Sequence, residues 1–196
     1  SAMRMLTRSG RGDAVGLLAE ASRRMIEGQI LEYDNSFNYR LAPRTYYEII
    51  RRKTASLFES IAALAARLPG GSPDREQEFR RFGRDFGMIF QVGDDLLDLF
   101  SGQSGKGRFQ DLKEGKVTLP YILLVQGGAL PLIRSFDPAR PGPLLERCRS
   151  LEVLERSRRA VDPHHRRCLA FLGAFPPSPH RDALRSLLAG LRCREH

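Results

Sequence analysis

The chain has 196 residues, of which 41% are hydrophobic, and this is enough for one folded domain with a sizeable buried core. Its 32 Lys and Arg exceed its 23 Asp and Glu, so the net charge is +9. No apolar run is long enough to cross a membrane, and no basic-then-apolar segment is typical of a secretion signal. We therefore expect no transmembrane segment.

The three cysteines, Cys148, Cys168 and Cys193, lack the paired spacing of a disulfide framework or a thiolate zinc site. This pattern favours a reduced, cytoplasmic protein. Residues 1–2 resemble a cloning remnant, and the domain is expected to span residues 3–196.

Helical periodicity dominates the N-terminal half, where no strand pattern or hairpin turn stands out. Apolar residues recur at helical spacing over residues 13–34. A second helix is predicted from Pro43 to the stop signal Pro69-Gly70-Gly71. A third is predicted from Ser72-Pro73-Asp74 to Ser101-Gly102.

The C-terminal half is predicted to hold shorter helices joined by loops. A loop with several glycines spans residues 102–115, and an apolar helix runs from Leu119-Pro120 to Gly127-Gly128. The proline-containing stretch 136–143 is interpreted as a linker. Two amphipathic basic helices and a last short helix follow it, so the chain is predicted to be an all-α bundle.

The C-terminal third carries much of the positive charge. Between Arg134 and His196 there are thirteen arginines against seven acidic residues, an excess of +6. Binding to a nucleic acid is therefore one alternative function. Because the arginines are interleaved with glutamates and no recognition module is visible, we expect no nucleic-acid partner.

Lysine is rare in this chain, with four residues among the 32 basic ones, and three of the four lie within eleven residues. A compact ammonium suits binding to a phosphate group, so the clustered lysines indicate a phosphate-holding loop. The alternative is a solvated loop with a few charges. The four are Lys53, Lys106, Lys113 and Lys116.

An acidic motif, Asp94-Asp95-Leu96-Leu97-Asp98, lies near the end of the third predicted helix. Asp94 and Asp98 are one turn apart on one face, whereas Asp95 is turned by about 100° and could join only through water or a second ion. Repulsion between the Asp94 and Asp98 carboxylates favours a bound cation. A site with oxygen ligands and no histidine or thiolate favours magnesium. The alternative is a solvated acidic face.

Lys53 and Thr54 lie in the middle of the second predicted helix. Lys53 falls within an apolar series, so its side chain is expected to point inward or along the edge of the core. The alternative is a lysine that covers apolar surface and reaches solvent. The Thr54 hydroxyl and the Gln91 carboxamide are neutral dipoles that could face a developing positive charge.

These motifs, taken in order, resemble those of the trans-isoprenyl diphosphate synthases, or polyprenyl synthetases. The resemblance runs from about Arg4 to the C-terminus. It rests on Lys53-Thr54, Phe90-Gln91, residues 94–98, Gly105-Lys106 and residues 111–120, with Gly28-Gln29 similar to a further family segment. It implies an all-α bundle around a central cavity, usually a homodimer, that condenses an allylic diphosphate with isopentenyl diphosphate.

The resemblance also implies three groups of functional residues. They are magnesium ligands on the allylic diphosphate, lysines that hold that diphosphate, and polar groups beside the allylic carbon. The magnesium ligands are Asp94 and Asp98, with Asp95 in support. The lysines are Lys53 and Lys106, with Lys116 nearby. The polar groups are Thr54 and Gln91.

The sequence departs from the family pattern in two ways. No first aspartate-rich motif precedes Lys53, so we expect the C-terminal part of a synthase domain, without its N-terminal helices and inactive alone. The alternative is a non-catalytic subunit that assembles with a complete synthase. In addition, Phe109 stands where the family usually has glycine, and we expect it to change how the preceding loop closes.

Overall fold

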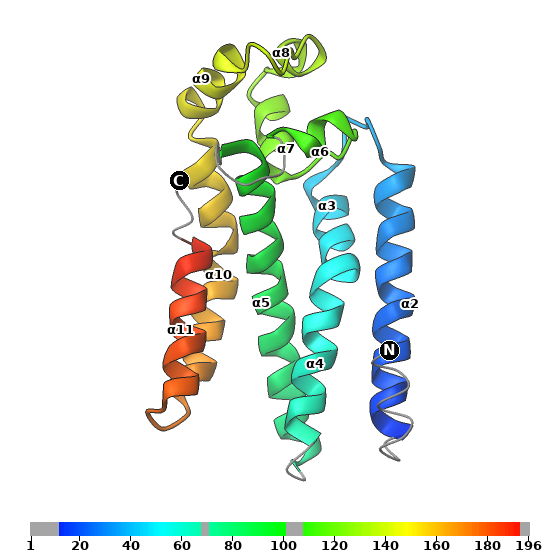
Figure 1. Ribbon diagram of the computed structural model, residues 1–196, viewed down its shortest axis with the longest axis vertical. Helices are drawn as coiled ribbons and strands as arrows, with labels where there is room; N and C mark the ends of the chain where they lie inside the picture. The colour runs from blue at the N-terminus through cyan, green and yellow to red at the C-terminus, as the bar shows by residue number, and fades with distance from the viewer. Residues whose placement is uncertain (1–11, 68–70, 101–107, 193–196) are drawn as a thin grey trace.

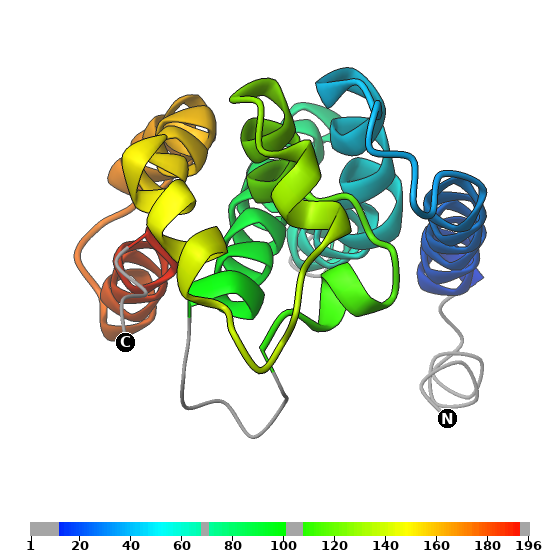
Figure 2. The ribbon, with the colours of Figure 1, turned by 90° about the horizontal axis from the view of Figure 1, so that it is seen from above.

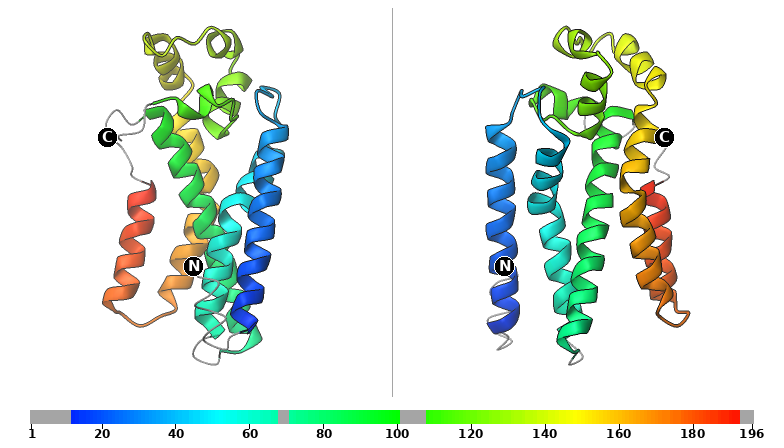
Figure 3. Two further views of the ribbon diagram at one scale, coloured as in Figure 1. Left: turned by 45° about the vertical axis from the view of Figure 1, so that its right-hand side comes forward. Right: turned by 180° about the vertical axis from the view of Figure 1, so that it is seen from behind.

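The computed structural model describes residues 12–67, 71–100 and 108–192, and these form helices and turns without a β-strand. Long helices run alongside one another, and short helices gather at one end of them (Figures 1 and 3). The long ones are α2 (Gly12–Asp34), the continuous α3 (Pro43–Ile50), η1 (Arg51–Ala55) and α4 (Ser56–Arg67), α5 (Pro73–Phe100), α10 (Val153–Gly173) and α11 (Pro179–Arg192). The short ones are α6 (Gln110–Lys113), α7 (Leu119–Gln126), α8 (Leu130–Arg134) and α9 (Gly142–Ser150). The all-α prediction is confirmed.

The helix α5 begins where the sequence predicts it. Pro73 is its first residue, and the Ser72 hydroxyl oxygen accepts a hydrogen bond from the backbone N–H of Arg75 at 3.3 Å. A side-chain acceptor before the first turn and a proline within it are the usual signals of a helix start.

Two glycines allow α5 to approach α4 and η1 closely. A Cβ on Gly83 would lie 2.3 Å from the carbonyl oxygen of Phe58, and a Cβ on Gly87 would lie 2.6 Å from Cα of Ala55. Both distances are well inside normal van der Waals separation. A side chain at either position would therefore push the two helices apart.

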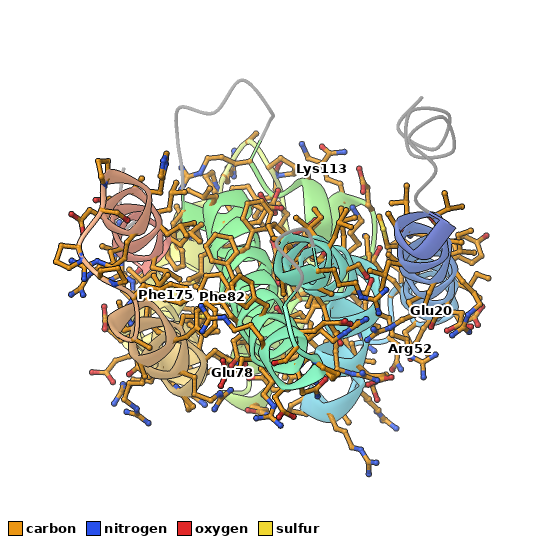
Figure 4. All side chains as sticks on the ribbon, turned by 90° about the horizontal axis from the view of Figure 1, so that it is seen from below. Glu20, Arg52, Glu78, Phe82, Lys113 and Phe175 are labelled. Carbon is orange, nitrogen blue, oxygen red and sulfur yellow. The ribbon has the colours of Figure 1, made fainter. Side chains whose placement is uncertain are left out.

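The hydrophobic core surrounds α5, which packs against α4 and η1 and also against α7, α10 and α11. An aromatic cluster extends this core toward the C-terminal helices. Phe82 stacks on Phe171 with ring centres 4.7 Å apart, and Phe171 meets Phe175 at 5.1 Å. Figure 4 shows Phe82 and Phe175 between α5 and the C-terminal helices.

A buried carboxylate adds an ionic link between α5 and α10. Asp85 is 5% exposed and accepts two hydrogen bonds from the Arg167 guanidinium, at 2.7 and 2.8 Å. Nδ1 of His164 lies 2.6 Å from the same carboxylate. Burial acts to raise the pKa of Asp85, but hydrogen bonds from Arg167 and His164 outweigh it, so the pKa is lower than usual.

The helix α2 lies at the edge of the bundle, as Figures 1 and 2 show. Its side chains include large apolar residues that are exposed to solvent. Ile26, Ile30 and Tyr33 are 61%, 55% and 77% exposed, and Phe37 just after the helix is 60% exposed. The spacing of Ile26, Ile30 and Tyr33 by three or four residues places these three on one face of the helix.

The structure differs from the predicted elements in the C-terminal half. Residues 110–113 form α6 inside the predicted loop, and residues 130–134 form α8, which the sequence pattern did not indicate. Cys148 and Cys168 are buried free thiols. Among the described residues, no helix is both long and apolar enough to cross a membrane.

Candidate functional site

Lys53 and Thr54 lie in η1, a single π turn between α3 and α4. A π turn hydrogen-bonds over five residues instead of four, and such turns are frequent at functional sites. The Ser56 hydroxyl donates a hydrogen bond to the carbonyl oxygen of Arg52 at 2.6 Å, just after this turn. The sequence pattern predicted an uninterrupted helix here, and the π turn changes which way the side chains point.

The close approach of α2 to η1 places Glu32 beside Lys53. A Cβ on Gly28 would lie 2.5 Å from the backbone nitrogen of Lys53, so only glycine fits at that position. One turn further along α2, Oε2 of Glu32 lies 2.6 Å from Nζ of Lys53. The two side chains are largely buried, which strengthens this ion pair relative to one at the surface.

Thr54 and Gln91 meet where α5 approaches η1. The Thr54 hydroxyl donates a hydrogen bond to Oε1 of Gln91 at 2.6 Å. Gly87, one turn before Gln91, is the residue whose lack of a side chain admits Ala55, the neighbour of Thr54. The structure thus brings together the two residues that were predicted to lie beside the allylic carbon.

Asp95 faces the interior of the bundle. It is 3% exposed, and its two oxygens accept hydrogen bonds from Nε2 of Gln91 at 2.9 Å and from the Tyr46 hydroxyl at 2.5 Å. Burial raises the pKa of Asp95 to about 8, although both hydrogen bonds act to lower it. Both oxygens are therefore engaged within the protein.

Asp98 holds the start of α6 against the end of α5. Its carboxylate accepts hydrogen bonds from the backbone N–H groups of Gln110 at 2.8 Å and Asp111 at 3.3 Å. Phe109, just before them, is 2% exposed with φ of 62°, and its ring lies 4.7 Å from that of Phe136. A left-handed φ explains why glycine is favoured at this position, and here the buried ring offsets the strain.

A second group of charges lies beside Asp98. Burial, and next the neighbouring Asp98 carboxylate, raise the pKa of Asp111 to about 6. Nζ of Lys116 lies 2.6 Å from Oε2 of Glu114 and 3.7 Å from Oδ1 of Asp111. Asp94 is exposed and makes no hydrogen bond or ion pair with another described residue. Negative charge thus accumulates at this end of α5.

One pocket brings Lys53 and Lys116, two of the three lysines predicted to hold the diphosphate, together with the buried network. No motif in the sequence indicated a role for Glu32, Tyr46 or Asp111. In the structure the Tyr46 hydroxyl is buried, and a buried tyrosine hydroxyl usually has a polar partner. The predicted Lys106 lies outside the described residues. Residues that line the pocket include Glu32, Tyr46, Lys53, Gln91, Asp95 and Lys116.

The donor set fits a hard divalent cation that keeps part of its water. Among the described residues, no three or more His, Cys, Asp or Glu side chains are arranged to hold a metal ion. Magnesium commonly uses one or two protein carboxylates, with waters and phosphate oxygens completing its coordination. Asp94 and Asp98 could supply those two. Burial raises the pKa of Asp98, and repulsion from Asp94 adds a smaller effect in the same direction, which a bound cation would relieve.

Comparisons with known proteins agree with this geometry. The chain is 32% identical over 193 residues to octaprenyl diphosphate synthase of Escherichia coli (strain K12), covering 93% of this chain and 60% of that protein. It superposes on polyprenyl synthase from Caulobacter crescentus CB15, complexed with calcium and isoprenyl diphosphate, with a TM-score of 0.88 and 27% identity.

That superposition covers 100% of this chain and 63% of the Caulobacter chain. A decaprenyl diphosphate synthase from Rhodobacter capsulatus superposes with a TM-score of 0.80 and 25% identity, over 98% of this chain and 63% of the other. The chain thus spans less than two thirds of the length of these relatives. Because the family model "Polyprenyl synthetase" matches residues 1–130, this chain belongs to the polyprenyl synthetase family.

Proposed function

We propose that this chain forms the allylic-diphosphate side of a polyprenyl diphosphate synthase, a magnesium-dependent trans-prenyltransferase. The reaction would condense an allylic diphosphate with isopentenyl diphosphate. The proposal is carried by one observation, the gathering of Lys53 and Lys116 in one pocket with Asp95 of α5, where Lys116 also lies 3.7 Å from Asp111 of α6. The names of the E. coli and Caulobacter relatives support the same substrate class.

The two lysines are placed to bind a diphosphate by exchanging partners. In the free protein, Lys53 is paired with Glu32 and Lys116 with Glu114. A diphosphate carries more negative charge than one carboxylate, so it can compete for both ammonium groups. Magnesium bound by Asp94 and Asp98 would neutralise the diphosphate as it leaves, and Lys106 is proposed to assist.

The polar groups at η1 and α5 would face the carbon that loses the diphosphate. The oxygens of Thr54 and Gln91 carry no net charge, so they can stabilise positive charge without forming a bond to it. Phe58, one turn after Thr54, lies 5.4 Å from Phe90, the neighbour of Gln91. This aromatic surface would keep water from the reactive carbon.

Residues 1–196 contain one DDxxD sequence, at 94–98, where the family resemblance implies two. We therefore propose that this chain alone binds an allylic diphosphate but does not extend it. The same observation supports the second candidate, a non-catalytic subunit of a complete synthase. A cytoplasmic location and a homodimer are further proposals, the latter supported by the exposed apolar face of α2.

Calorimetry with inorganic pyrophosphate tests the site. We expect binding in MgCl2 and none in EDTA, because the Asp94 and Asp98 carboxylates repel a polyanion unless a cation intervenes. Asp94→Ala should remove most of the magnesium dependence, whereas Asp74→Ala at the opposite end of α5 should retain it. Equal binding in EDTA would contradict the proposal.

A lysine pair sharpens the same measurement. Lys53→Met should weaken pyrophosphate binding about tenfold, as expected for loss of one charge-assisted contact. Lys113 belongs to the same lysine cluster but is exposed and does not line the pocket, so Lys113→Met should leave binding unchanged. An incubation with geranyl diphosphate, labelled isopentenyl diphosphate and magnesium should give no extended product from this chain alone.

A further inference from the structure

Tyr46, Asp95, Gln91 and Thr54 form one continuous hydrogen-bonded chain across α3, α5 and η1. The Tyr46 hydroxyl donates to Oδ2 of Asp95, and Nε2 of Gln91 donates to Oδ1. Oε1 of Gln91 accepts from the Thr54 hydroxyl. The residue at the far end, Tyr46, is 2% exposed.

The direction of this chain is given by the atoms that face one another. Tyr46 donates to one oxygen of Asp95, and the Gln91 carboxamide turns its NH2 group toward the other. Its carbonyl consequently faces Thr54, whose hydroxyl donates, because a carbonyl oxygen can only accept.

A hydroxyl has one hydrogen to donate and two lone pairs that accept. Because the hydrogen of Thr54 is committed to Gln91, Thr54 presents its lone pairs to the remaining surroundings. Lone pairs attract a positive charge, whereas an O–H hydrogen directed at the same place would repel it. The network therefore determines the sign of the dipole that Thr54 offers.

We propose that Tyr46 and Asp95 are positioning residues that set the polarity of the Thr54 hydroxyl, so that its oxygen faces a cationic reaction centre. This inference rests on the proposed function, since it assumes that positive charge develops beside Thr54. It gives Asp95 a role in orienting Gln91, distinct from that of Asp94, which is exposed to solvent.

The test compares a cation with a neutral molecule of the same shape. Geranyl ammonium and geraniol are each titrated into this chain, with saturating inorganic pyrophosphate and MgCl2, in a calorimeter. The wild-type chain should prefer the ammonium. Tyr46→Phe removes one oxygen, and we expect that preference to fall about fivefold, as for one lost hydrogen bond, with geraniol binding unchanged.

Tyr47→Phe is the matched control, because the Tyr47 ring packs 5.3 Å from that of Tyr46 but does not line the pocket. It should leave the preference intact. Asp95→Ala, provided that it folds by circular dichroism, should lose the preference further than Tyr46→Phe. A general loss of packing would weaken both ligands equally and would leave their ratio unchanged.

The outcomes separate this inference from the proposed function. If the wild-type chain fails to bind pyrophosphate with magnesium, the proposed function is wrong. If it binds pyrophosphate but takes geranyl ammonium and geraniol equally, or if Tyr46→Phe keeps the full preference, the polarity inference is wrong.

Discussion

The helices α5 and α2, of 28 and 23 residues, are packed in opposite ways. α5 is covered on several sides, and its buried positions include Gly83, Gly87 and Asp85 beside its apolar residues. α2 packs against α3, η1 and α4, and it leaves Ile26 and Ile30 exposed. The packing of a helix is thus decided by where small residues admit a neighbour, and apolar content alone does not reveal it.

A side chain where α5 contacts η1 should break this arrangement with the largest effect. Gly87→Val would force a Cβ within 2.6 Å of Cα of Ala55, and we expect a loss of about 3 kcal/mol in unfolding free energy or failure to fold. Gly16→Ala in α2 meets open space, so it should stabilise the chain by about 0.5–1 kcal/mol. Urea denaturation measures both, and equal effects would contradict the contrast.

The C-terminal end of α5 can be tested at Phe109. Phe109→Ala should cost about 3 kcal/mol, because the ring is buried against Phe136. Phe109→Gly should cost about 1 kcal/mol less than the alanine variant, because glycine adopts the φ of 62° without strain. Denaturant titration of the pair measures the difference, and a more stable alanine variant would refute this account of the strain.

The ionic link from α5 to α10 makes a pH-dependent prediction. The folded-state pKa of Asp85 is below its usual value, so its contribution is fully present above the unfolded-state pKa. That contribution is lost as the pH falls from about 4 through the lower folded-state pKa. Asp85→Asn should lower stability at pH 7 by about 2 kcal/mol and flatten the acid limb of the stability profile. If the stability of the variant falls at acidic pH as steeply as that of the wild type, other carboxylates are responsible for the loss of stability in acid.

The exposed face of α2 should affect association far more than stability. Ile26→Glu with Ile30→Glu should change the unfolding free energy by less than about 0.5 kcal/mol, since both positions are exposed. We expect the wild-type chain to self-associate through this face and the double variant to sediment as a monomer. Ile61→Glu on α4, also at an exposed isoleucine, is the control and should sediment like the wild type.

The sequence was sufficient to predict the helices whose apolar spacing and end signals agree, such as α5 from Ser72-Pro73-Asp74 onward. It also predicted Thr54 and Gln91 as partners in one site, through the resemblance. It did not reveal that Glu32 and Tyr46 belong to the site. Glu32 is one of several acidic residues on an amphipathic helix, and Tyr46 fits the apolar series of its own helix. Their partners lie on other helices, so only the fold brings these contacts together.

The placement of Asp95 shows a similar limit. Helical spacing correctly predicted that the Asp95 side chain points away from those of Asp94 and Asp98. It did not predict which neighbouring helix Asp95 faces. The fold supplies that direction, because it brings the Tyr46 hydroxyl of α3 to the carboxylate. The role of Asp95 beside a metal stays a prediction.

The π turn at residues 51–55 holds one residue more than a regular α-helical turn would. Deleting one residue there would restore regular α-helical hydrogen bonds and would leave Tyr46 before the turn and Phe58 after it facing α5. The change would fall on Lys53 and Thr54, whose side chains would leave the positions opposite Glu32 and Gln91 that the turn gives them.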